Sequence, residues 1–123
     1  HNFTNSSGNT FKLALYTSSA NLGASTTAYA TTNEASGSNY SAGGNTLTNV
    51  TPSLDSTTAI TDFDNTSWNS STITARGGLI YNSSASNKAV AVLDFGSDKS
   101  SSNGTFSVIF PAPAASTAII RIA

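Results

Sequence analysis

The clearest pattern of apolar and polar positions runs through residues 73–95. Apolar or small residues occupy every second position from Ile73 to Tyr81, the pattern of a strand with one buried face. Residues 89–95 are apolar on both sides, which is typical of a central strand. The polar residues 82–88 separate the two segments. The pattern therefore predicts a hairpin at the middle of an all-β domain.

Shorter segments with a similar pattern predict the other strands, at residues 11–16, 47–50, 59–63, 105–110 and 118–122. Residues 64–67 are expected to form a turn before Trp68, and residues 96–104 a polar loop. Gly77 and Gly78 predict a bulge or a close approach of another backbone. We expect Trp68 to pack against the core. Seven to eight short strands with turns between them predict a single-domain antiparallel β-sandwich or jelly roll at residues 11–123.

Two segments lack a strand pattern. Residues 1–10 are polar, with Phe3 as their one apolar anchor, and predict a loosely held N-terminal arm. Residues 17–44 consist mainly of small and polar residues. A segment of this length predicts either a functional loop or short elements that periodicity does not reveal.

The composition narrows the class of protein. Ser, Thr and Asn make up 53 of 123 residues, and charged residues only 9%, against roughly a quarter in typical soluble domains. With a net charge of −1 and no clustered Lys or Arg, we expect neither nucleic acid nor an anionic membrane as a partner. The absence of Cys excludes disulfides and thiol chemistry. No apolar run approaches a membrane span, so we expect a soluble protein.

No residue pattern indicates an enzyme. His1 is the only His and belongs to the predicted arm, where a nucleophile and its base would be poorly held. Asp62 and Asp64 could act as an acid/base pair on one strand face. An Asx turn from Asp64 to Asn65 with a solvated Asp62 is the favoured interpretation. We therefore expect no catalytic residues.

A metal site is also not expected. Asp94 and Asp98 flank Gly96, and loops of this kind can bind Ca²⁺. The neighbouring Lys99 and the small number of acidic ligands favour a plain hairpin turn. We expect neither a metal nor a cofactor.

Four residues are candidates for an interface: Phe3, Glu34, Tyr40 and Arg76. Arg76 lies in a predicted strand between Ala75 and two glycines, where small neighbours leave room for a flat guanidinium. It could pair with Glu34 or with a carboxylate of a neighbouring subunit, or it could be an exposed residue on a polar strand face. The sequence leaves these interpretations open.

Six runs of sequence resemble a family of small structural proteins of tailed bacteriophages. They are FKLALYTSS (residues 11–19), TTNEASG (31–37), YSAGG (40–44), ITARGGLIYN (73–82), KAVAVLDFGSDK (88–99) and AIIRIA (118–123). The similarity covers nearly all of the chain after Thr10 and excludes residues 1–9. The family brings no catalytic motif.

This resemblance implies a virion component, in the first place a capsid decoration or cement protein that binds the outer capsid in many copies. Its partners would be the major capsid protein and sister copies in a homo-oligomer, which is often a trimer in proteins of this kind. The alternatives are a tail, neck or fibre component, or a carbohydrate-binding β-sandwich. The carbohydrate-binding alternative requires exposed aromatic stacking platforms, for which Trp68, Tyr29, Tyr40 and Tyr81 are the candidates.

Overall fold

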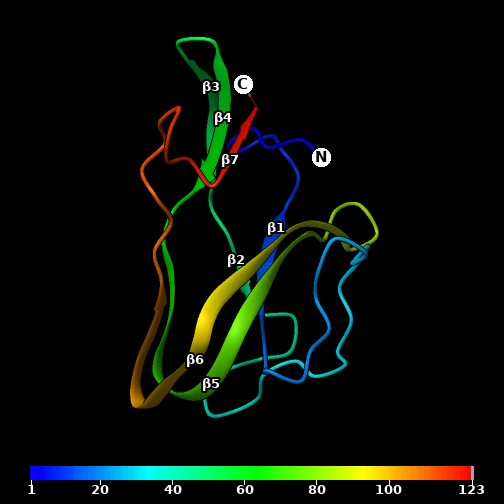
Figure 1. Ribbon diagram of the computed structural model, residues 1–123, viewed down its shortest axis with the longest axis vertical. Coiled ribbons are helices and arrows are strands. Elements are labelled where there is room, and N and C mark those ends of the chain that lie inside the picture. Colours follow the sequence, from blue (N-terminus) through cyan, green and yellow to red (C-terminus); the bar gives the residue numbers. More distant parts are fainter. Residues whose placement is uncertain (123) are drawn as a thin grey trace.

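The computed structural model describes residues 1–122, which form seven strands in two antiparallel sheets (Figure 1). One sheet has the order β2-β1-β5-β6 and the other β3-β4-β7. The strands are β1 Phe11–Tyr16, β2 Asn45–Thr46, β3 Asn49–Asp55, β4 Thr58–Phe63, β5 Thr66–Asn82, β6 Lys88–Val108 and β7 Ile120–Ile122. The predicted all-β antiparallel fold is confirmed. Residues 1–122 contain no helix long and apolar enough to cross a membrane.

The prediction of a polar loop at residues 96–104 is wrong, because β6 continues through them as a 21-residue strand. Hydroxyl groups connect this polar stretch to β5. The hydroxyl oxygens of Ser71 and Ser101 lie 2.9 Å apart, and those of Thr74 and Ser100 are also 2.9 Å apart. These hydrogen bonds take the place of apolar contacts across the two strands. The predicted turn at residues 64–67 is shorter than expected, since β5 begins at Thr66.

The long β5–β6 ribbon bends sharply at the lower end of the molecule (Figure 1). The pairing register shifts twice between Trp68 and Ile73, and Ser70 and Asn103 have positive φ. We call residues 88–100 the first limb of β6 and residues 104–108 its second limb. The bend allows one pair of strands to form two walls around a core.

A bulge interrupts the ribbon at the predicted position. Ala75 pairs with Lys99 and Gly77 with Asp94, so that residues 95–98 of β6 lie opposite Arg76 alone. A Cβ on Gly77 would lie 2.6 Å from the carbonyl oxygen of Leu93, closer than real Cβ contacts. Both parts of the glycine prediction, the bulge and the close backbone approach, are confirmed.

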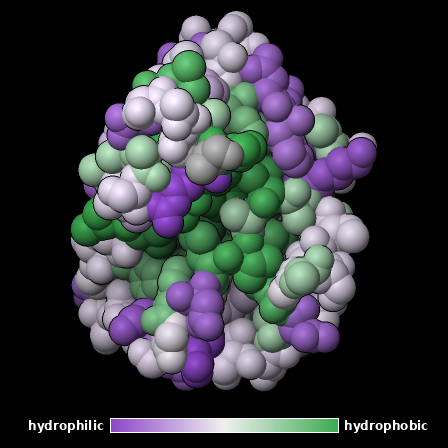
Figure 2. Space-filling model, turned by 45° about the horizontal axis from the view of Figure 1, so that its top comes forward, coloured by the Kyte–Doolittle hydropathy of each residue, from purple (hydrophilic) through white to green (hydrophobic). Residues whose placement is uncertain are grey.

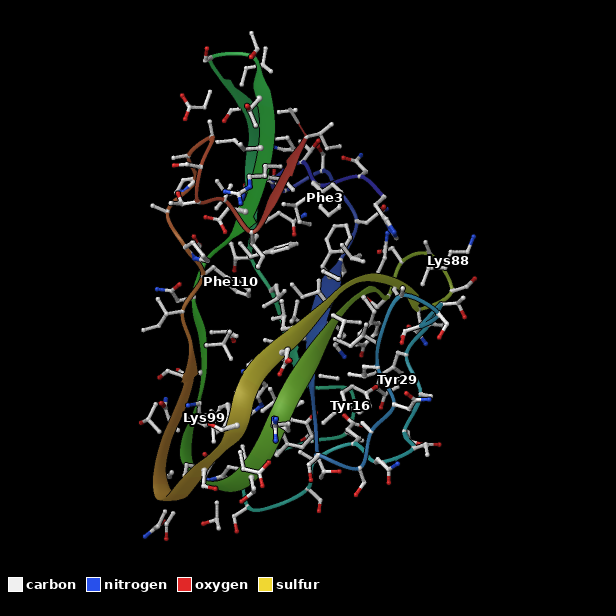
Figure 3. All side chains as sticks on the ribbon, viewed as in Figure 1. Phe3, Tyr16, Tyr29, Lys88, Lys99 and Phe110 are labelled. Atoms are coloured by element: carbon white, nitrogen blue, oxygen red, sulfur yellow. The ribbon has the colours of Figure 1, made fainter. Side chains whose placement is uncertain are left out.

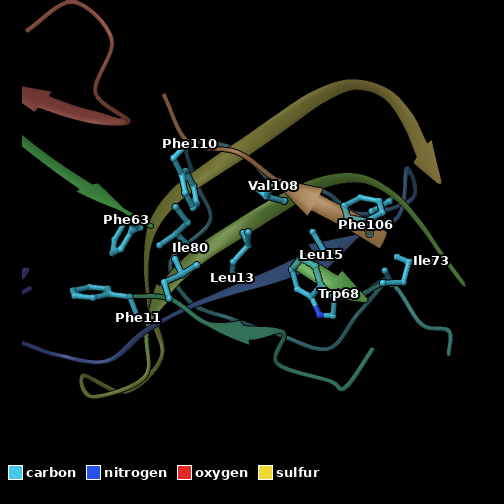
Figure 4. Close-up of a cluster of buried hydrophobic side chains, with 13 residues drawn as sticks. Phe11, Leu13, Leu15, Phe63, Trp68, Ile73, Ile80, Phe106, Val108 and Phe110 are labelled. Carbon is cyan, nitrogen blue, oxygen red and sulfur yellow. The ribbon is translucent and has the colours of Figure 1, made fainter. Parts of the chain in front are cut away.

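The main core lies on one face of the four-stranded sheet, against the second limb and β4 (Figure 4). Trp68 is only 4% exposed, as predicted, and packs against Phe106 with its ring edge-on. Leu13, Leu15 and Ile80 supply fully buried aliphatic side chains from β1 and β5. Burying a side chain of this size contributes about 1.5–3 kcal/mol.

Residues 17–44, which we call the covering loop, contact both faces of the four-stranded sheet: Ala20, Leu22 and Tyr29 lie over the opposite face, whereas Ala35 and Tyr40 pack with the main core. On the opposite face a second buried cluster forms, which consists of Ala14, Tyr16, Leu79 and Tyr81. Leu22 and Tyr29 of the covering loop pack against it. Isolated bridges join Glu34 to Tyr16 and Ala28 to Lys88. The covering loop therefore acts as a third layer without regular strands of its own.

The expectation that the N-terminal residues are loosely held is wrong. The side-chain amide of Asn82, which is fully buried, donates a hydrogen bond of 3.0 Å to the side-chain oxygen of Asn9. The side-chain amide of Asn49 donates to the carbonyl oxygens of Thr4 and Asn9. Two asparagines far apart in the sequence thus hold the first ten residues against the sheets.

Candidate interaction surface

Glu34, a predicted interface residue, is the centre of a polar cluster within the covering loop. Its Oε1 accepts a hydrogen bond of 2.7 Å from the hydroxyl of Tyr29, and its Oε2 accepts one of 2.7 Å from Tyr40. The backbone N–H of Gly43 also donates to Oε2, at 2.8 Å. The carboxylate therefore joins three separate points of residues 29–43, and its hydrogen-bonding capacity is largely engaged within the chain.

The tyrosines around Glu34 are held in their neutral form. Burial and the hydrogen bond to the Glu34 carboxylate raise the pKa values of Tyr29 and Tyr40 well above the ordinary value of 10.0. Burial, followed by the charge of Glu34, raises the pKa of Tyr81 to about 12. The Tyr81 hydroxyl donates to the carbonyl oxygen of Gly43 at 2.7 Å. Each hydroxyl therefore remains a hydrogen-bond donor at neutral pH.

Phe3 and Tyr40, two other predicted interface residues, also make contacts inside the domain. The ring of Phe3 is stacked on Phe11 with centroids 4.7 Å apart, and it meets Phe63 edge-on (Figure 3). Tyr40 packs against Trp68, and its hydroxyl accepts a hydrogen bond from the backbone N–H of Leu15. Both side chains are half-buried. Their role in an interface stays a prediction.

Arg76 is exposed and lies in β5 opposite the bulge of β6. Together with Asp94 and Tyr16 it lines a shallow surface hollow of about 140 Å³. Within residues 1–122, no ion pair joins Arg76 to Glu34. Its exposure agrees equally with a residue on a polar strand face and with one that pairs with a carboxylate of a neighbouring subunit, so a role of Arg76 in an interface stays a prediction.

The carboxylates considered for catalysis differ in their surroundings. Asp62 is 5% exposed, and its Oδ1 accepts a hydrogen bond from the N–H of Phe63, whereas Asp64 is exposed beyond the end of β4. The expectation of a solvated Asp62 is wrong. The side-chain oxygen of Asn65 accepts a hydrogen bond from the N–H of Phe110, so this residue fixes the end of the second limb.

Asp94 and Asp98 lie at the bulge in β6 and not in a hairpin turn. Asp94 accepts a hydrogen bond of 2.8 Å from the N–H of Gly96, whose φ of +80° suits glycine. Among residues 1–122, no group of three or more His, Cys, Asp or Glu residues is placed to hold a metal ion.

The aromatic residues proposed for carbohydrate stacking do not form an exposed platform. Trp68 and Tyr81 are 4% and 3% exposed. Tyr29 lies face-to-face on Tyr81 with centroids 4.7 Å apart, and Tyr40 contacts Trp68. The rings therefore stack on one another and on the core, and the structure does not favour this alternative.

A concave surface opens between the two limbs of β6, with four apolar side chains at its base and edge and four polar residues around them. We call it the apolar hollow; it has a volume of about 420 Å³ and is lined by Phe95, Lys99, Ser100, Thr105, Phe106, Ser107, Val108 and Ile109. Phe95 and Phe106 also belong to the main core, so the core continues to the surface here. Ile109 at its rim is 75% exposed. Apolar side chains gather in a hollow at the centre of the face that Figure 2 shows.

The hollow and the β6 edge were not predicted from the sequence. The sequence signal for them was weak: apolar residues on both sides of 89–95 predicted a central strand, but β6 is the last strand of its sheet. Val92 is 36% exposed as a result. An apolar strand at a sheet edge leaves backbone and side chains available to a partner.

Comparisons with known proteins found no relative of this chain. No family model matches the chain, and no curated protein or solved structure matches it either. What the geometry defines is an all-β protein with a closed sheet face and an open apolar hollow.

Proposed function

We propose that the protein is a structural component of a tailed-bacteriophage virion, and that it acts as a decoration or cement protein on the outer capsid. The observation that carries the proposal is the apolar hollow, where the half-buried Phe95 and the exposed Ile109 lie beside the unpaired outer edge of β6. Exposed apolar surface of this kind marks binding sites for other proteins. The phage assignment itself rests on the resemblance of the six sequence runs.

The chemistry of the surface supports attachment to a large protein assembly. Lys99 is the one charged residue among those that line the hollow, and the rim carries hydroxyl groups of Ser100, Thr105 and Ser107. An apolar centre with a polar rim is the usual composition of a protein interface. The capsid would contribute an apolar side chain or loop that fills the hollow.

Binding to capsids tests the proposal directly. The purified protein would be sedimented with DNA-filled capsids that lack it, and with isolated tails for comparison. We expect saturable binding to capsids in many copies. Binding to tails alone would overturn the capsid assignment in favour of a tail, neck or fibre component, and binding to neither would overturn the virion assignment.

A pair of variants tests the role of the hollow. Ile109→Asp places a charge at its rim, where the side chain is 75% exposed, and should weaken capsid binding by at least about tenfold. Leu54→Asp is the matched control, because Leu54 is 72% exposed but lies in the β3–β4 hairpin, away from the hollow. Equal binding of the two variants would contradict attachment through the hollow.

A further inference from the structure

One asparagine of the chain is followed directly by glycine. Asn103 precedes Gly104, and none of the other Asn residues has Gly after it. The main-chain nitrogen of a following residue can attack the side-chain amide of an asparagine and close a ring. Glycine favours this ring closure, because it has no side chain to hinder the approach and its backbone is conformationally permissive. Asn103 is therefore the asparagine whose sequence most favours deamidation.

The fold places Asn103 at the bend between the two limbs of β6. Ser102 and Asn103 lie between two register shifts and have no partner residue in β5. Asn103 is exposed and has a φ of +49°, in the left-handed region. Its backbone N–H donates a hydrogen bond of 3.0 Å to the hydroxyl of Thr72 in place of a strand partner. The pairing that holds the rest of the ribbon is absent at Asn103, which leaves its main chain room to rotate.

The side chain of Asn103 is also free to turn. Within residues 1–122 its amide makes no hydrogen bond, whereas the amides of Asn49 and Asn82 are held by other parts of the chain. The next residue is open to approach as well. Apart from its chain neighbours, a Cβ on Gly104 would meet only the carbonyl oxygen of Ser102, at 3.7 Å. Neither hydrogen bonding nor crowding opposes contact between the Asn103 amide and the Gly104 nitrogen.

Asn87 provides a comparison within the same chain. It is exposed, its φ is +57°, and its side-chain amide makes no hydrogen bond within residues 1–122. The residue after it is Lys88, whose side chain hinders ring closure at the main-chain nitrogen. Asn87 and Asn103 thus share exposure and backbone conformation and differ in the residue that follows.

We propose that Asn103 is a site of spontaneous deamidation. The nitrogen of Gly104 gives up its proton to solvent and bonds to Cγ of Asn103. The bond from Cγ to Nδ2 breaks, and Nδ2 takes up a proton and leaves as ammonia. Water then opens the cyclic imide: cleavage between Cγ and the Gly104 nitrogen gives aspartate, and cleavage between the main-chain carbonyl carbon and that nitrogen gives isoaspartate. Water is the only co-reactant.

The modification changes the surroundings of the apolar hollow. Either product adds a negative charge to a chain whose net charge is −1, and isoaspartate adds one carbon to the main chain. The bend joins Ser100 to Thr105, and both residues line the hollow. Capsid binding should therefore decline as the protein ages. This consequence rests on the proposed function, whereas the chemistry at Asn103 does not.

Incubation of the unmodified chain at mildly alkaline pH tests the site. Peptide mapping by mass spectrometry measures deamidation at each asparagine, and an isoaspartate methyltransferase detects isoaspartate. We expect Asn103 to react at least about tenfold faster than Asn87, which corresponds to about 1.4 kcal/mol in activation free energy. Both aspartate and isoaspartate should form, more slowly at mildly acidic pH. Equal rates at the two asparagines, or aspartate as the only product, would overturn the proposal.

Gly104→Ala is the matched control. It keeps Asn103, and the added Cβ makes only an ordinary contact at a position without positive φ. Thermal unfolding establishes that the variant is folded. Its deamidation at Asn103 should be at least about tenfold slower, and an unchanged rate would overturn the proposal.

Aged samples of the two proteins test the effect on the hollow. After the same incubation, the unmodified chain should bind capsids more weakly than Gly104→Ala. Equal binding after isoaspartate has formed would contradict the effect on the hollow. Absence of capsid binding by the fresh protein would be a failure of the proposed function, and the deamidation rates would still decide the proposal for Asn103.

Discussion

The two faces of the four-stranded sheet differ in what completes them. One face is closed by the covering loop, and Glu34 and the surrounding tyrosines satisfy one another's hydrogen bonds within the chain. On the other face the core reaches the surface in the apolar hollow, beside the unpaired edge of β6. The closed face contributes stability, whereas the open face leaves apolar surface and backbone groups for partners. Substitutions on the two faces should therefore affect different measurements.

Removing the Glu34 carboxylate should produce the largest loss of stability. Glu34→Ala leaves two tyrosine hydroxyls and the N–H of Gly43 without their acceptor. Because hydrogen bonds to charged groups contribute about 1.5–3 kcal/mol each and are only partly replaced by water, we expect a loss of ~3 kcal/mol. Urea unfolding followed by the fluorescence of Trp68 measures the free energy of unfolding.

Glu34→Gln is the control for this substitution. It keeps the shape and one acceptor oxygen but replaces the other oxygen with a donor, so its loss should be smaller than that of Glu34→Ala. A Glu34→Ala protein as stable as the unmodified chain would mean that the covering loop does not depend on the carboxylate.

Alkaline pH should cause the next largest loss of stability, through the tyrosines of the closed face. The pKa of Tyr81 is raised to about 12 in the folded protein, from 10.0 in the unfolded chain. Folding therefore favours the neutral form of Tyr81. The resulting contribution to the free energy of unfolding is fully present below pH 10. It is lost as the pH rises from 10 towards 12, because the unfolded chain releases its protons first. We expect the free energy of unfolding to fall across this range.

The same titration distinguishes the two faces. The tyrosines with raised pKa values, Tyr16, Tyr29, Tyr40 and Tyr81, all contact residues of the covering loop or belong to it. Ultraviolet absorbance of tyrosinate should follow the loss of stability. Absorbance that rises around pH 10 while the protein is still folded would contradict the burial of these hydroxyls.

The sequence predicted some strands and missed part of another, and the difference follows from what stabilises each of them. Alternating apolar residues correctly predicted β1 and β4 and the middle of β5, because a half-buried strand requires that pattern. The continuation of β6 through residues 96–104 was missed, since it depends on hydroxyl pairs such as that of Ser71 and Ser101. Such pairs leave no trace in the apolar pattern.

The site could be predicted less well than the fold. Glu34 and Tyr40 were named as interface candidates, but the sequence does not show that they bind each other or Tyr29. That contact depends on how the covering loop folds back over β1. The position of β6 at the edge depends on strand order, which local patterns do not encode. For this reason the open face became visible only in three dimensions.

Removal of the Tyr81 hydroxyl should cost less than removal of the carboxylate. Tyr81→Phe leaves the ring stacked on Tyr29 but removes the hydrogen bond to the carbonyl oxygen of Gly43. One neutral hydrogen bond contributes about 1 kcal/mol. We expect a loss of this size in urea unfolding, together with a weaker dependence on pH above 10. An unchanged pH dependence would assign the alkaline effect to the other tyrosines.

Substitution on the open face should change stability least. Ile109→Ser removes an apolar side chain that is 75% exposed, so folding transfers little of its surface out of water. Surface substitutions of this kind change the free energy of unfolding by less than about 0.5 kcal/mol. The same variant should bind capsids more weakly, because the partner loses an apolar contact at the rim of the hollow. If Ile109→Ser instead destabilised the isolated chain as much as Tyr81→Phe, the hollow would be part of the protein's own core, and the distinction between a closed and an open face would fail.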